Sequence, residues 1–163
     1  MKITFCGAAQ TVTGSRFLVD NGKKVLIDCG LFQGPRLWRE RNWSDLPFDP
    51  AQLDAVVLTH AHIDHSGFLP RLVKLGFQGR LICTPATADL LSLLLPDSAR
   101  IQEEDAAFAN KKKYTRHDPA LPLYTEEDAR KALKLLQTVD FYKTIRFSSS
   151  LSFQFLRAGH ILG

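Results

Sequence analysis

Short apolar runs separated by polar turns dominate the first half of the chain. Each run is apolar and partly β-branched over a few positions, which is typical of strands. The triplet Asp20-Asn21-Gly22 between two of these runs is a hairpin turn signal. The pattern therefore predicts strands at residues 2–6, 15–19, 24–27, 53–58 and 80–83. The second and third of these strands are expected to pair as a hairpin.

Helix signals appear between and after these strands. Residues 68–75 fit a short helix that ends at Gly76, and residues 86–95 fit a helix that stops at Pro96, because proline cannot continue the backbone hydrogen bonds of a helix. Residues 98–110 fit a further helix, and a helix is also compatible with residues 36–41. Thr125 followed by three acidic residues predicts a capped helix that runs to about Thr138.

The last part of the chain returns to strand-like patterning. Residues 143–147 and 151–156 flank three serines, Ser148 to Ser150, and are expected to pair, while residues 111–123 read as a charged loop with two prolines. Strands and helices mixed in this order predict an α/β fold with sandwich layers.

Composition limits the class of protein. With 163 residues, 45% of them hydrophobic, the chain can form one domain with its own core. Three cysteines without C-x-x-C spacing argue against a disulfide framework and indicate a reducing compartment. The most apolar run, residues 90–95, is too short for a bilayer, and the first residues lack the long apolar stretch of a signal peptide. We therefore expect a soluble, cytoplasmic protein with no membrane contact.

Candidate chemistry concentrates in one segment. Directly after the apolar run at residues 53–58, the sequence Thr59-His60-Ala61-His62-Ile63-Asp64-His65 brings three imidazoles and a carboxylate together. Imidazole and carboxylate groups are the ordinary ligands of Zn²⁺. Packing does not explain so many polar side chains at a strand end, because unpaired polar groups there cost free energy unless something binds them. The cluster predicts a metal site.

Two further polar positions follow predicted strands. Asp28 comes after the strand at residues 24–27, and His160 lies in Gly159-His160 after the last strand. Taken alone, Asp28 could cap a loop by accepting hydrogen bonds from backbone amides, and His160 could be incidental. His117 matches no motif and is expected to be an ordinary loop residue.

The order of these motifs resembles the metallo-β-lactamase superfamily, and more closely its β-CASP nucleases that process RNA. The resemblance covers essentially the whole chain. Besides the histidine segment, it is carried by residues 5–15 (FCGAAQTVTGS), 26–30 (LIDCG), 121–128 (LPLYTEED) and 158–163 (AGHILG). It implies an αββα sandwich with a dinuclear zinc site, of which this chain would form the N-terminal portion.

The resemblance also implies roles for individual residues. His60, His62 and His160 would bind a first zinc ion, and Asp64 and His65 a second. Asp28 would fix a ligand or the metal-bound water, and Asp64 could position the attacking hydroxide, so both carboxylates are candidate catalytic residues. The implied reaction is hydrolysis of RNA phosphodiesters by a metal-activated hydroxide, with single-stranded RNA as partner. A homodimer is compatible with this picture.

The family pattern contains features that residues 1–163 do not. They are a bridging aspartate one strand beyond the third motif, an inserted β-CASP domain and further downstream histidines. We therefore expect residues 1–163 to be the N-terminal part of a metallo-β-lactamase domain that holds one zinc ion or none, with little nuclease activity alone. The sequence leaves open three other functions: a superfamily hydrolase of thioesters, lactams or small phosphoesters, a DNA-directed enzyme, and a non-catalytic metal-binding subunit.

Overall fold

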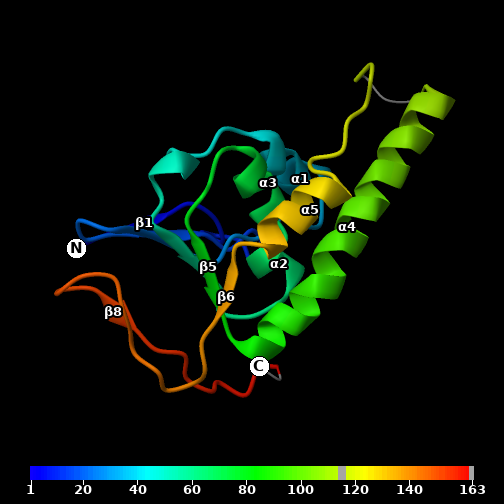
Figure 1. Cartoon of the computed structure of the whole chain (residues 1–163). Helices are drawn as coiled ribbons and strands as arrows, with labels where there is room; N and C mark the ends of the chain where they lie inside the picture. The colour runs from blue at the N-terminus through cyan, green and yellow to red at the C-terminus, as the bar shows by residue number, and fades with distance from the viewer. Residues whose placement is uncertain (114–116, 162–163) are drawn as a thin grey trace.

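A six-stranded sheet forms the centre of the protein in the computed structural model, which describes residues 1–113 and 117–161 (Figure 1). Leu162 and Gly163 of the last motif lie outside the described residues. The strand order is β1-β2-β3-β4-β5-β6. The first three strands are antiparallel neighbours, and β3 to β6 run parallel. The strands are β1 (Lys2–Phe5), β2 (Phe17–Asp20), β3 (Lys24–Ile27), β4 (Ala55–Val57), β5 (Arg80–Cys83) and β6 (Leu136–Thr138).

The hairpin predicted between the second and third strands is confirmed. Strands β2 and β3 pair with Leu18 opposite Leu26. The turn between them contains Gly22 at φ +79°, and the Gly22 amide donates to the Asp20 carboxylate over 3.1 Å. Glycine adopts this left-handed conformation without steric cost, which is why the Asn-Gly signal was informative here.

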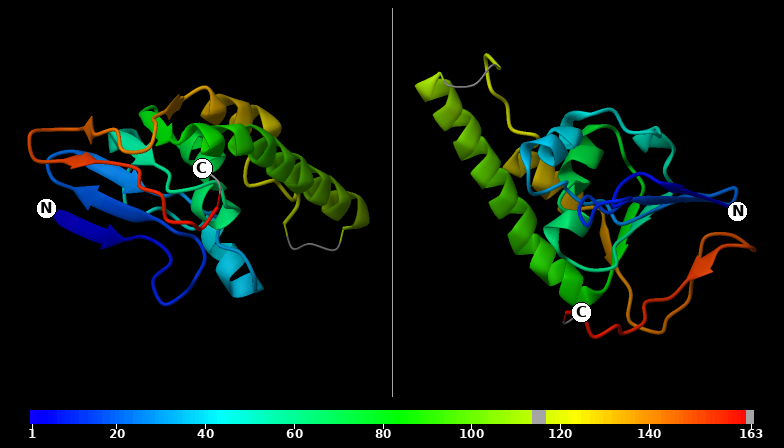
Figure 2. Two further views of the ribbon diagram at one scale, coloured as in Figure 1. Left: turned by 90° about the horizontal axis from the view of Figure 1, so that it is seen from below. Right: turned by 180° about the vertical axis from the view of Figure 1, so that it is seen from behind.

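The two faces of the sheet pack against different layers. Leu26, Val56 and Leu81 face the helices, whereas Val25, Val57 and Ile82, each adjacent to one of them in sequence, face the opposite way. On that second face lies a small antiparallel sheet of β7 (Ile145–Arg146) and β8 (Ser152–Phe153). The views in Figure 2 show the helices on one side of the main sheet and the β7–β8 hairpin on the other. The predicted α/β layering is confirmed, and the predicted strands at residues 143–147 and 151–156 exist in shorter form.

The helical layer comprises elements of very different length. Helix α4 is the longest, at 28 residues, and α5 packs against both α3 and α4 (Figure 1). Their apolar faces, which include Leu72 of α3 and Leu91 of α4, pack with Phe68 and Tyr124 in the main core. The elements are α1 (Arg36–Arg39), the 3-10 helices η1 (Glu40–Trp43) and η2 (Pro50–Gln52), α2 (Ile63–Ser66), α3 (Leu69–Lys74), α4 (Pro85–Lys112) and α5 (Glu126–Leu133).

The prediction of two helices separated by Pro96 is wrong. Helix α4 is continuous over 28 residues with Pro96 inside it. Leu91, Leu95 and Ala99 are spaced four residues apart on one face and are fully buried. Burial of this continuous apolar face on both sides of the proline offsets the one backbone hydrogen bond that proline removes.

The predicted end of the next helix is also wrong. Helix α5 begins as expected, with Thr125 and Asp128 forming a capping box, but it ends at Leu133 rather than near Thr138. Residues 136–138 form β6 instead, parallel to β5, with Leu136 paired to Leu81. Pairing with the free side of β5 decides this segment, and sequence periodicity over three residues cannot reveal it.

Among the described residues, no helix combines the length and apolarity that crossing a bilayer requires.

Candidate metal centre

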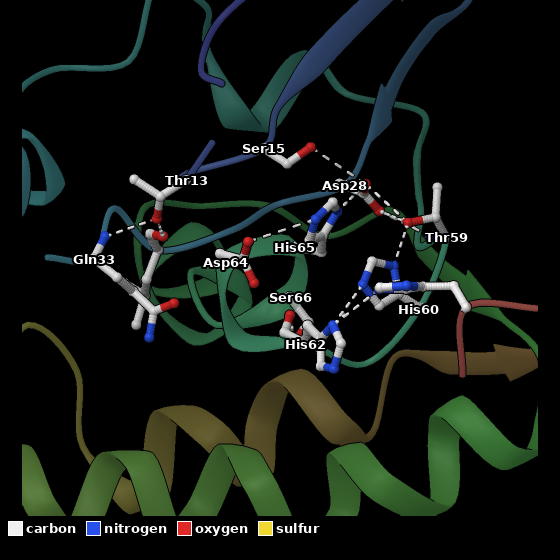
Figure 3. A network of polar contacts seen from close by, with 12 residues as sticks. Thr13, Ser15, Asp28, Gln33, Thr59, His60, His62, Asp64, His65 and Ser66 are labelled. Carbon is white, nitrogen blue, oxygen red and sulfur yellow. Dashed lines mark hydrogen bonds and ion pairs between the residues drawn. The ribbon is translucent and has the colours of Figure 1, made fainter. Parts of the chain in front are cut away.

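The carboxyl ends of two adjacent parallel strands define the site. Strand β3 ends at Ile27 and is followed by Asp28, and β4 ends at Val57, two positions before Thr59 and three before His60. Because β3 and β4 are parallel neighbours, these side chains emerge at the same edge of the sheet. Figure 3 shows them converging with the short helix α2, which carries Asp64 and His65.

Three imidazoles from two distant parts of the chain meet at this edge. The ligand atoms of His60, His62 and His160 all lie within 4.8 Å of one another. His60 Nε2 is 3.0 Å from His62 Nδ1, and His160 Nε2 is 3.3 Å from the same His62 atom. A tetrahedral ion with metal–nitrogen bonds of about 2.0–2.1 Å needs ligand nitrogens about 3.3–3.4 Å apart. The cluster therefore fits a metal ion.

Asp28 is a buried carboxylate that accepts hydrogen bonds from the residues around the imidazoles. Its side chain is 2% exposed, and its backbone has φ +59°, a left-handed conformation that aspartate tolerates better than most residues. One carboxylate oxygen accepts from the Thr59 amide at 2.8 Å, and the other accepts from His65 Nδ1 at 2.7 Å and from the Ser15 hydroxyl at 3.3 Å. The carboxylate therefore fixes His65 directly and orients its Nε2 toward the site.

Thr59 extends this control to His60. Its hydroxyl lies 3.0 Å from both oxygens of Asp28 and 2.9 Å from His60 Nδ1. A carboxylate only accepts, so the single hydroxyl proton goes to Asp28 and the hydroxyl oxygen accepts from His60 Nδ1. This pattern favours the His60 tautomer with its proton on Nδ1, which leaves the Nε2 lone pair for a metal ion.

The pKa values of the two imidazoles held by Asp28 are shifted in opposite directions. Burial, and after it the neighbouring His65, lower the pKa of His60 to about 4. The hydrogen bond to Asp28 instead raises the pKa of His65 above its usual value. His60 is therefore neutral near pH 7, as a metal ligand must be.

The remaining sequence-predicted residues fall into two groups. Asp64 Oδ2 lies 3.6 Å from His65 Nε2, so this pair stands beside the three-histidine cluster as candidate ligands of a second ion. His60 and His65 connect the two sets, with ring centroids 4.1 Å apart. His117 lies elsewhere, in the lining of a groove beside α4. The metal and catalytic roles of His60, His62, Asp64, His65, His160 and Asp28 stay predictions.

Sequence reasoning missed three residues that build the site. Thr59 and Ser15 bond Asp28, as described above. Gly30 is the third, because a Cβ there would lie 1.6 Å from the Asp64 carbonyl oxygen. Thr59 immediately precedes His60, so its position in the motif was the available signal. Nothing in the sequence near Gly30 indicates which backbone it contacts.

We expect Thr59→Val to weaken metal affinity by about 10- to 100-fold, because valine keeps the shape but removes the hydroxyl between Asp28 and His60. Thr59→Ser keeps the hydroxyl and should bind metal like the unchanged chain. Competition against a chromophoric chelator measures both affinities. Equal affinity of the valine and serine variants would show that the hydroxyl does not orient His60.

Comparison with known proteins places this site in a family. The sequence model of one protein family, the metallo-beta-lactamase superfamily, matches residues 13–135. These residues include Asp28 and the His60–His65 segment. The chain belongs to this superfamily. The fold class predicted from the resemblance is therefore confirmed.

Within the metallo-beta-lactamase superfamily, the curated relatives carry RNA-related names. Ribonuclease TTHA0252 of Thermus thermophilus is 37% identical over all of this chain, which covers 33% of its length. Transcription termination factor FttA of Methanocaldococcus jannaschii is 32% identical over all of this chain, which covers 24% of it. Cleavage and polyadenylation specificity factor subunit 3-I of Arabidopsis thaliana is 30% identical over 99% of this chain, which covers 21% of it.

These relatives confirm the resemblance to the RNA-processing branch of the superfamily. The chain spans a third or less of the length of each relative named above.

Proposed function

We propose that the protein is a zinc-dependent ribonuclease that hydrolyses RNA phosphodiesters. The observation that carries this proposal is the spacing of three imidazoles in a chain of the metallo-beta-lactamase superfamily. His60 Nε2 and His160 Nε2 lie 3.0 and 3.3 Å from His62 Nδ1, at the carboxyl-end edge of the sheet. Relatives named as a ribonuclease and as an endoribonuclease support RNA as the substrate.

The donor set favours zinc as the ion. Neutral imidazoles with a carboxylate nearby are typical zinc ligands, whereas calcium and magnesium prefer oxygen ligands only. In this proposal His60, His62 and His160 hold one ion. Asp64 and His65 contribute to a second ion in an enzyme that supplies further ligands, and residues 1–163 by themselves hold one ion or none.

Bound zinc supplies positive charge for the phosphoryl oxygens and lowers the pKa of a water toward neutrality. The residues of the chain supply orientation. In this proposal Asp64, on α2, would accept a hydrogen bond from the attacking water and align it with phosphorus. Asp28 stays out of contact with substrate in this scheme and holds His65 and, through Thr59, His60 in position.

The test is RNA cleavage by the protein as its gene encodes it and by the 163-residue chain alone. We expect the encoded protein to cut single-stranded RNA, to stop when a chelator removes the metal and to recover with Zn²⁺. The double variant Asp64→Ala/His65→Ala should lose cutting by at least about 1,000-fold, since it removes two candidate ligands. Equal cutting by that variant, or activity on single-stranded DNA, thioesters or lactams but not on RNA, would refute the proposal.

Two sequence predictions accompany this function. We propose a cytoplasmic location, in keeping with the three free cysteines Cys6, Cys29 and Cys83, two of which are buried. A homodimer also stays a prediction. Cell fractionation tests the first, and light scattering coupled to size-exclusion chromatography tests the second.

A further inference from the structure

Two segments near the metal centre join into one arm. Residues 141–143 follow β6, and residues 155–157 follow β8. The Tyr142 amide donates to the Phe155 carbonyl over 2.9 Å, which ties the two segments together. In Figures 1 and 2 they run side by side, orange and red, toward the C-terminus. We call residues 141–143 and 155–157 the Tyr142 arm.

The arm lies at the same edge of the sheet as the candidate metal ligands. It leaves β6 at the carboxyl end, and the carboxyl ends of β3 and β4 carry Asp28 and His60. At its other end, Arg157 is three residues from His160, whose imidazole belongs to the three-histidine cluster. A strand of nucleic acid whose phosphate reaches the cluster would pass beside the arm.

The arm presents an aromatic ring on an anchored base. Phe141 packs into the core between the two sheets, and the Arg157 guanidinium lies 5.2 Å from its ring centroid. Next to this anchor, Tyr142 is 60% exposed and has φ +64°. A bulky residue in this left-handed conformation is an outlier, and such strain collects at functional positions. The exposed phenol ring therefore lies 6.2 Å, centroid to centroid, from the Phe141 ring that the Arg157 guanidinium contacts.

Charge favours a polyanion as the occupant. Residues 140–161 contain Lys143, Arg146 and Arg157 against one acidic residue, Asp140, so this segment has an excess of positive charge. A groove beside α4, of about 940 Å³, is a poorer path for RNA, because three carboxylates and only two guanidinium groups line it. Those groups are Glu40, Asp97 and Asp105 against Arg36 and Arg39.

We propose that the Tyr142 arm binds single-stranded RNA next to the scissile phosphate, with a base stacked on Tyr142 and backbone phosphates paired with Arg157 and Lys143. Aromatic stacking accepts any base, and cations beside it follow the backbone, so the arm would bind without sequence preference. This inference rests on the proposed ribonuclease function and assigns it a substrate-binding surface.

The test measures RNA binding rather than turnover. Fluorescence anisotropy measures binding of a short labelled single-stranded RNA by the encoded protein and by its variants. The buffer contains EDTA, so that no cutting occurs. Tyr142→Ala is expected to weaken binding by about 5- to 20-fold, and Tyr142→Phe, which keeps the ring and the same backbone strain, should bind normally. Arg157→Gln should weaken binding and make the slope of log K against log salt shallower by about 0.7.

The matched control is Arg130→Gln on α5, which removes another exposed arginine, outside the arm, and should leave binding and slope unchanged. If the encoded protein binds RNA and its Tyr142 and Arg157 variants bind as well as it does, the arm proposal is wrong and the ribonuclease proposal stands. If the encoded protein neither binds nor cuts RNA, both proposals fail.

Discussion

Replacement of Gly30 by alanine is expected to lower the stability of the protein by about 3 kcal/mol or more and to abolish measurable metal binding. An alanine Cβ would lie 1.6 Å from the Asp64 carbonyl oxygen and 2.7 Å from the His65 amide nitrogen. Both atoms belong to backbone, which cannot rotate away as the end of a side chain can. Helix α2 must therefore move by more than 1 Å from the loop that carries Gly30.

That movement would break the bonds that hold α2 on the sheet edge. The Cys29 amide donates to the His65 carbonyl over 2.7 Å, the Leu31 amide to the Ile63 carbonyl over 3.0 Å, and the Ser15 amide to the Asp64 carbonyl over 2.8 Å. A metal site needs its ligands held within about 0.5 Å. Helix α2 carries Asp64 and His65 and has His62 as its N-cap residue, so its displacement moves all three out of position.

Thermal unfolding and metal titration check this expectation. A loss of about 3 kcal/mol corresponds to a fall in Tm of roughly 6–12 °C for a chain of this size. Gly34→Ala is the control, since its Cβ would meet nothing within 4 Å and only its φ of +91° makes alanine unfavourable. It should cost about 1 kcal/mol and leave metal affinity unchanged. A Gly30→Ala variant that melts and binds metal like Gly34→Ala would contradict the packing described here.

Removal of the Asp28 carboxylate is the second change with a large expected effect. In Asp28→Ala, the Thr59 amide, the Thr59 hydroxyl and His65 Nδ1 lose their acceptor. Leaving a buried donor unpaired costs about 1–3 kcal/mol, so we expect a loss of about 3 kcal/mol in stability. Metal affinity should fall by about 10- to 100-fold or more, because both His60 and His65 lose their orientation.

Asp28→Asn separates the two effects. Asparagine also tolerates the left-handed backbone at this position and keeps one oxygen for the Thr59 amide, so the protein should fold with most of its stability. The side-chain NH2 that replaces the second oxygen donates and cannot accept from His65 Nδ1, so metal affinity should still fall. Chemical denaturation and chelator competition measure the two quantities. If Asp28→Asn matched the unchanged chain in both, a positioning role for the charge would be excluded.

The accuracy of the sequence predictions depended on how local the deciding interaction is. The hairpin at Asn21-Gly22 and the start of α5 at Thr125 were right because the turn glycine and the capping box act over a few residues. The break at Pro96 and the end of α5 were wrong because distant surfaces decide them. The main core holds α4 straight through its proline, and β5 recruits residues 136–138 as a strand.

The candidate site divides in the same way. The sequence by itself determined which ligand types are present and that His60, His62, Asp64 and His65 share one short segment, because those neighbours cannot move far apart. Only the tertiary structure decided that His160 reaches His62, that one buried carboxylate orients two imidazoles, and that Gly30 leaves room for α2. Those relations join residues 31 to 98 positions apart, and strand pairing and core packing, rather than local propensity, bring such residues together.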